Sequence, residues 1–128
     1  MAGREAGEKD IYESGEDYLE AILMLREERG RVFAIDIAKR LEVSKASVSK
    51  ALSKLEAKGY VQMDGRDVLL TQTGLPIAEM ILTRHRFFTQ MLVSAGVDSH
   101  TAAEEACHME HTISDATFEK LVEHYGSH

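Results

Sequence analysis

The chain has 128 residues, of which 44% are hydrophobic, with one proline and no tryptophan, as expected for a small and mostly helical protein with a real core. No apolar run reaches the roughly 18–20 residues that span a bilayer, and the charged first ten residues lack the apolar core of a signal peptide. Because Cys107 is the single cysteine, no intramolecular disulfide can form. We therefore expect a cytoplasmic protein with a reduced thiol and no membrane partner.

The net charge of −7 is unevenly distributed. Residues 30–66 hold eight basic and four acidic residues, a net charge of +4, which leaves −11 for the remainder. A local basic surface on an acidic protein can still bind phosphate, because the electrostatic field near that surface, and not the net charge of the protein, determines whether phosphate is attracted. The acidic remainder suits cation binding.

The first helix is expected over residues 11–29, after a flexible tail over residues 1–10, and Gly30 is suited to end it. Within this helix Asp17 and Glu20 stand three residues apart, so they project from one side. Taken alone, these two carboxylates are more simply a solvated acidic patch.

Two short helices joined by a tight turn come next, over residues 34–41 and 45–58, with Ser44 suited to cap the second. One face of the second helix is apolar, and the other carries hydroxyls and cations without an acid between Lys45 and Leu55. Such side chains donate to phosphates and base edges, which is typical of a DNA-reading helix-turn-helix rather than an ordinary helical hairpin. The candidate DNA-binding residues on this helix are Lys45, Ala46, Ser47, Ser49, Lys50, Ser53 and Lys54.

A two-stranded wing is predicted directly after this helix, because the spacing of the hydrophobic residues there no longer fits a helix and fits strands instead. Residues 60–63 and 68–71 read as strands around the Asp-Gly turn of residues 64–67. Arg66 at the tip is placed to reach a backbone phosphate or the minor groove, and the alternative is an ordinary turn charge.

Helices are predicted for the rest of the chain. The expected extents of these helices are residues 73–95, residue 98 or 99 to about 111, and residues 114–125, with Thr73, Asp98 or Ser99, and Ser114 as N-caps. His85 lies inside the first of them, and a lone histidine in a helix is more often structural than a ligand.

A thiol, a carboxylate and an imidazole lie close together near the end of the second of these helices. Cys107, Glu110 and His111 stand at positions i, i+3 and i+4, so a helix brings them to one face. All three types bind divalent transition metals, and a bound cation removes the repulsion between thiolate and carboxylate. The alternative is a polar helix face with one buried cysteine.

The order of these parts resembles the metal-dependent repressors of the diphtheria toxin repressor and manganese transport regulator family, over about residues 12–125. This resemblance implies a mainly α protein, with a winged helix-turn-helix DNA-binding domain over residues 11–73 and an all-helical dimerisation and metal-binding domain over residues 74–128. The motifs that carry the resemblance are Glu16-Asp17-Tyr18-Leu19-Glu20, Leu70-Thr-x-x-Gly74, Arg84-His85 and Glu105-Ala-Cys107-x-x-Glu110-His111.

The resemblance also implies a metal site. The residues that match the family's ligand positions are Asp17, Glu20, His85, Cys107, Glu110 and His111. Cys107 is the residue of iron-type members and Asp17 that of manganese-type members, so the expected cofactor is Fe²⁺ or Mn²⁺. Because a thiolate favours later ions, Co²⁺, Ni²⁺ or Zn²⁺ can substitute. Thr89 and Ala103 stand where iron-type members place ligands of an ancillary site, which puts that second site in doubt.

The implied function is a metal-ion-activated transcriptional regulator, as a repressor in iron or manganese homeostasis. It would bind a palindromic operator in double-stranded DNA as a homodimer, and metal would order that dimer. Three other readings stay open: a winged-helix regulator that responds to a small organic ligand, with the polar cluster structural; a protein-interaction module; and a metalloenzyme. An enzyme is disfavoured because the sequence shows no nucleophile–base pair and no glycine-rich phosphate loop.

Overall fold

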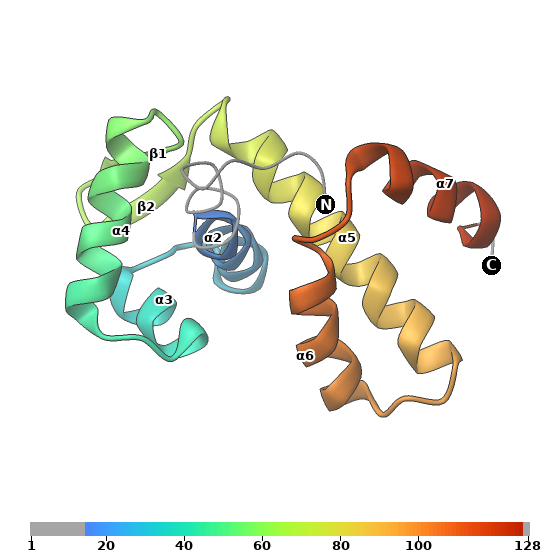
Figure 1. The fold of residues 1–128 in the computed structure, drawn as a ribbon. Helices are drawn as coiled ribbons and strands as arrows, with labels where there is room; N and C mark the ends of the chain where they lie inside the picture. The colour runs from blue at the N-terminus through green and yellow to red at the C-terminus, as the bar shows by residue number, and fades with distance from the viewer. Residues whose placement is uncertain (1–14, 127–128) are drawn as a thin grey trace. The chain divides into compact units, whose positions relative to one another are not determined.

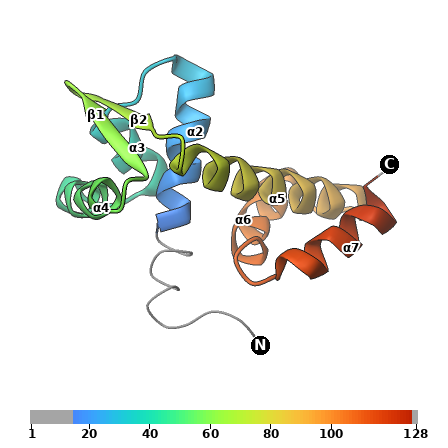
Figure 2. The ribbon, with the colours of Figure 1, turned by 90° about the horizontal axis from the view of Figure 1, so that it is seen from above.

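The computed structural model describes residues 15–126, so the tail expected over residues 1–10 lies outside the described part. These residues fall into two compact units that divide between Glu79 and Met80. The mainly α class and the winged helix-turn-helix predicted from the sequence are confirmed. The elements, drawn in Figures 1 and 2, are α2 (Glu16–Arg29), α3 (Ala34–Leu41), α4 (Lys45–Ala57), β1 (Val61–Asp64), β2 (Asp67–Leu70), α5 (Gly74–Ser94), α6 (Ser99–Met109) and α7 (Asp115–Tyr125).

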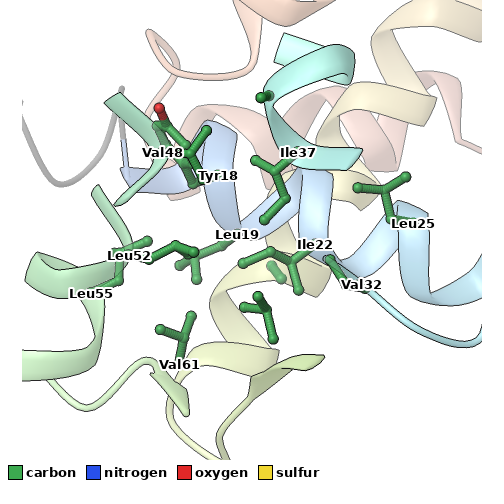
Figure 3. Close-up of a cluster of buried hydrophobic side chains, with 13 residues drawn as sticks. Tyr18, Leu19, Ile22, Leu25, Val32, Ile37, Val48, Leu52, Leu55 and Val61 are labelled. Carbon is green, nitrogen blue, oxygen red and sulfur yellow. The ribbon is translucent and has the colours of Figure 1, made fainter. Parts of the chain in front are cut away.

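One apolar cluster holds the first unit together. Figure 3 shows Leu19 of α2 between Leu52 of α4 and Ile22. Burying an aliphatic side chain of this size stabilises a fold by about 1.5–3 kcal/mol, so the cluster fixes α2 against the helix-turn-helix. Its buried members are Tyr18, Leu19, Ile22, Leu25, Val32, Ile37, Ala38, Val48, Leu52, Leu55, Val61, Val68 and Ala78.

The turn between α3 and α4 is set by two local features. Glu42 adopts a left-handed conformation with φ of 57°, and its backbone N–H donates to Ala38 O, which ends α3. Ser44 then caps α4 as predicted, because its Oγ accepts a hydrogen bond from the Ser47 N–H at 3.1 Å. The tight turn leaves the polar face of α4 exposed.

The predicted wing is present, with its strands shifted toward the turn. β1 and β2 pair antiparallel, with Val61 opposite Leu70 and Asp64 opposite Asp67, so only Gly65 and Arg66 connect them. Gly65 has φ of +65°, which is the left-handed conformation that two-residue hairpin turns require. Arg66 therefore lies at the tip, as expected.

An arginine of α2 anchors β2 directly next to the turn of the wing. Arg26 donates to both carboxylate oxygens of Asp67, at 3.2 and 3.1 Å, and to Val68 O at 2.6 Å. Asp67 also accepts the Val32 backbone N–H at 2.9 Å. The Arg26 hydrogen bonds, and next the Val32 N–H, hold the pKa of Asp67 below its ordinary value of 3.8. The wing is thus joined to α2 by a charged, bidentate contact.

The start of α5 is fastened to the other end of the wing. Thr71 Oγ1 donates to Gly59 O at 2.6 Å and accepts the Gly74 N–H at 3.0 Å, so Thr71 rather than the predicted Thr73 provides the side-chain cap. A Cβ on Gly74 would lie 2.0 Å from Tyr60 O. Only glycine therefore fits this close approach of two backbone segments.

The second unit contains most of α5 together with α6 and α7. The Phe118 ring of α7 packs edge-on against Phe87 at 5.3 Å between centroids and lies 5.9 Å from Phe88, which is fully buried. Asp98 and Ser114 cap α6 and α7 as predicted. Among the described residues, no helix combines the length and the hydropathy that crossing a membrane would need.

Candidate metal centre

Three candidate ligands meet inside the second unit. His85 lies in the middle of α5, Cys107 in the last turn of α6, and Glu110 caps the C-terminus of α6. His85 Nδ1 is 3.0 Å from Glu110 Oε1 and 3.7 Å from Cys107 Sγ. One ligand atom from each of the three residues lies within 4.8 Å of the other two.

These spacings fit a first-row divalent ion. With metal–ligand bonds of about 2.0–2.3 Å, neighbouring ligand atoms around a tetrahedral or octahedral ion lie about 2.8–3.8 Å apart. The observed 3.0 and 3.7 Å separations fall within that range. A nitrogen, a sulfur and an oxygen donor together also match the preferences of Fe²⁺, Co²⁺ and Zn²⁺. Without metal, the 3.0 Å contact serves as a hydrogen bond between imidazole and carboxylate.

The carboxylate is the most deeply buried group among the three ligands. The Glu110 side chain is fully buried and that of His85 is 14% exposed, whereas Cys107 is exposed. His111 is buried, and its Nε2 lies 3.4 Å from Glu110 Oε2. Glu110 therefore sits between two imidazoles. Buried carboxylates in proteins are paired or bind metal, and this one can do either.

The other two predicted ligands belong to the first unit. Asp17 and Glu20 lie on α2 at the predicted three-residue spacing, with Glu20 buried and Asp17 half-buried. Tyr18 stands between these two carboxylates in the sequence. Its burial, followed by the negative charge of Asp17, raises the pKa of the Tyr18 phenol. A buried Glu20 differs from the solvated patch that this pair would form by itself. The convergence of these carboxylates with the His85 cluster remains a prediction.

The eight predicted DNA-binding residues are all exposed, seven of them on α4 and Arg66 on the wing. The Ser44 hydroxyl donates to Ser47 Oγ at 3.0 Å, which fixes one hydroxyl at the start of α4. The apolar face of α4 is buried through Val48, Leu52 and Leu55. α4 therefore presents the polar face that the sequence indicated, available to a ligand.

A buried arginine next to the site was not predicted. Arg84 is 1% exposed and contacts the segment that follows α6. The sequence offered only its place beside His85, because arginines are seldom buried and spacing carries no information about this one.

Comparison with known proteins assigns the family. Residues 10–68 match the N-terminal DNA binding domain of iron dependent repressors, and residues 71–128 match their metal binding and dimerisation domain. The chain belongs to this family of metal-dependent transcriptional regulators, as the resemblance in the sequence predicted.

Individual relatives agree with this assignment. An uncharacterized HTH-type transcriptional regulator of Methanocaldococcus jannaschii is 37% identical over 112 residues, which cover 85% of this chain and 90% of that protein. The diphtheria toxin repressor of Corynebacterium glutamicum is 34% identical, over 90% of this chain and 51% of its own length. The chain thus spans about half of that repressor. The solved structure of a manganese-dependent transcriptional repressor in complex with manganese aligns with a TM-score of 0.78 and 30% identity, covering 87% of this chain and 52% of that one.

Proposed function

We propose that the chain is a cytoplasmic repressor that binds double-stranded DNA as a homodimer when Fe²⁺ or Mn²⁺ is bound, in the control of iron or manganese homeostasis. The observation that carries this proposal is the convergence of His85, Cys107 and Glu110 in the unit that follows the exposed basic helix α4. Residues 11–73 form the DNA-binding domain in this proposal, and residues 74–128 form the dimerisation and metal-binding domain.

The metal ligands of the proposal are the six residues that match the family pattern. His85, Cys107 and Glu110 form the described cluster. His111 is the neighbour of Glu110, and Asp17 and Glu20 bring carboxylates from α2, in the DNA-binding domain. A bound cation would supply positive charge that offsets these carboxylates and the thiolate, and in this proposal residues of both domains would hold it. Co²⁺, Ni²⁺ or Zn²⁺ can occupy the same donors, because raw affinity for such sites rises toward the later ions.

Metal would control DNA binding in this proposal because the ligands come from both the DNA-binding domain and the dimerisation domain. Without the cation, the carboxylates and the thiolate repel one another, so no single orientation of the two domains is favoured. A coupling free energy of about 1–3 kcal/mol, usual for allosteric switches, is enough to change affinity 5–150-fold. In a two-fold dimer, the favoured orientation sets the two α4 helices about 34–36 Å apart, or a multiple of that, which matches a palindromic operator.

Contacts to DNA are divided between the residues of α4 and the wing. Lys45, Lys50, Lys54 and Arg66 are exposed cations suited to phosphates, which position the protein without reading sequence. The hydroxyls of Ser47, Ser49 and Ser53 donate to phosphates or base edges, and the Ala46 methyl suits contact with a thymine methyl. Their common exposure along α4 supports this assignment.

The test begins with DNA selected from a random library by the Mn²⁺-loaded protein. The dissociation constant of the selected DNA is then measured with chelator, with Mn²⁺ and with anaerobic Fe²⁺. We expect metal to tighten binding at least tenfold for the wild type and not at all for Glu110→Gln, which keeps the volume of the buried side chain but removes its charge. Glu119→Gln, an exposed α7 position, is the matched control and should respond as the wild type.

Two outcomes would contradict the proposal. If chelator leaves the wild-type affinity unchanged, metal does not control binding, and a small organic ligand becomes the better trigger. If Glu110→Gln still responds fully to metal, the cation binds elsewhere. Asp17→Asn tests the α2 ligands by the same titration and should reduce the response to metal.

A further inference from the structure

Arg84 is a buried cation that bonds to both ends of the connection between α6 and α7. Its Nη1 donates to Glu110 O at 3.2 Å and to Ile113 O at 2.5 Å, and its Nη2 donates to the carboxylate of Asp115, the first residue of α7. The guanidinium carbon also lies 5.2 Å from the centroid of the Phe118 ring. One side chain of α5 thus holds the whole segment from Glu110 to Asp115.

The position of these bonds matters because the candidate ligands occupy a helix end. The last carbonyls of a helix accept no hydrogen bond from within that helix, and the last turn frays unless another donor satisfies them. Cys107 lies in the last turn of α6, Glu110 is its C-cap, and His111 follows. Arg84 satisfies the carbonyl of Glu110 itself, as well as one carbonyl beyond the helix.

Arg84 also immediately precedes His85 in α5. The same turn of α5 therefore provides one ligand, through His85, and the contact that fixes the backbone of a second ligand, Glu110. A shift of the α6 end would change the 3.0 Å and 3.7 Å separations from His85 to Glu110 and Cys107.

We propose that Arg84 is a positioning residue of the metal centre, which holds the end of α6 in place so that Cys107 and Glu110 face His85. This inference rests on the proposed function. Arg84 touches no ligand side chain in the described contacts and acts through the backbone of Glu110. Arginine suits the role because its planar fork can donate to three separate acceptors at once, which a lysine ammonium on a flexible stem does less well.

The first experiment uses the metal-free chain and follows backbone amide hydrogen exchange. Arg84→Met keeps the apolar stem and removes the donors, and Arg84→Lys keeps one charged donor. We expect residues 107–114 to exchange at least tenfold faster in Arg84→Met, by a smaller factor in Arg84→Lys, and unchanged in Lys120→Met, which removes an exposed charge of α7. Unchanged exchange in a folded Arg84→Met chain would overturn the proposal.

The second experiment adds Co²⁺ and follows its thiolate charge-transfer absorption, which reports on the bond to Cys107. We expect a 10–100-fold loss of Co²⁺ affinity in Arg84→Met, the size usual for residues that orient metal ligands, and a weaker thiolate band even at saturation. A merely structural arginine would lower thermal stability but leave affinity and the saturated spectrum at wild-type values, and that result would overturn the proposal. If Arg84→Met fails to fold, the same comparison is made with Arg84→Lys, where wild-type affinity and spectrum would overturn it.

Failure of the proposed function gives a different pattern. Wild-type protein that binds no Co²⁺ would refute the metal centre itself. The amide exchange of the metal-free chain would still show whether Arg84 holds the end of α6.

Discussion

Replacing Gly74 by alanine should destabilise the protein, although the same change inside most helices is stabilising. Alanine is favoured over glycine in a helix by about 1 kcal/mol. At position 74, however, the new Cβ would lie 2.0 Å from Tyr60 O, whereas an ordinary contact needs at least 3.4 Å. The start of α5 and the segment before β1 must therefore separate by more than an ångström.

The size of the effect follows from what holds these segments together. Separation lengthens the hydrogen bonds from Thr71 N to Tyr60 O, now 3.1 Å, and from Thr71 Oγ1 to Gly59 O, now 2.6 Å. Each is worth about 1 kcal/mol net. Overpacking strain adds about 1–3 kcal/mol. After the gain in helix propensity, we expect Gly74→Ala to lower the free energy of unfolding by about 2–4 kcal/mol.

Urea unfolding followed by circular dichroism measures this change, with the slope of the transition as a check that the unfolded states are alike. Thr83→Ala is the control: Thr83 is exposed in the same helix, so alanine should stabilise the fold there by about 0.5 kcal/mol. A Gly74→Ala chain as stable as the wild type, or more stable, would refute the close-approach reasoning.

Two further predictions concern the wing and α4. Because the folded pKa of Asp67 is lowered, its contribution to stability is present above about pH 4 and lost as pH falls through the folded value. Asp67→Asn should thus unfold in less urea than the wild type at pH 7, with a smaller difference at pH 3; a pH-independent difference would contradict this. Lys50→Ala should weaken binding to all DNA sequences alike and reduce the slope of log affinity against log salt by about 1, measured by fluorescence anisotropy; a sequence-selective loss would contradict a phosphate contact.

Much of the first unit could be predicted because its signals are local. The apolar stripe of α4, the Ser44 cap and the Asp-Gly turn each depend on residues a few positions apart, and the structure contains all three. The wing differs from its prediction by one residue at each strand, because pairing extends to Asp64 and Asp67 at the turn. The cap of α5 was harder to place: the sequence pattern indicated Thr73, whereas the side chain that accepts the Gly74 N–H is that of Thr71, which also donates to Gly59 O.

Features that depend on distant parts of the chain were accessible only through the family resemblance or not at all. The i, i+3, i+4 spacing placed Cys107, Glu110 and His111 at one helix end, but spacing cannot show that His85 approaches them from another helix. The burial of Glu110 and Arg84 had no local signal, because both types are usually exposed. The Leu70-Thr-x-x-Gly74 motif likewise marked the family, while its physical reason, the approach to Tyr60, became visible only in the structure.

The most direct test of the metal centre is a crystal structure of the Mn²⁺-loaded chain with anomalous scattering recorded at the manganese edge. We expect an anomalous peak within bonding distance of His85 Nδ1 and a Glu110 carboxylate oxygen, with Cys107 Sγ beside it. A peak bound to other residues, or a fully Mn²⁺-soaked crystal without a peak at this cluster, would contradict the account.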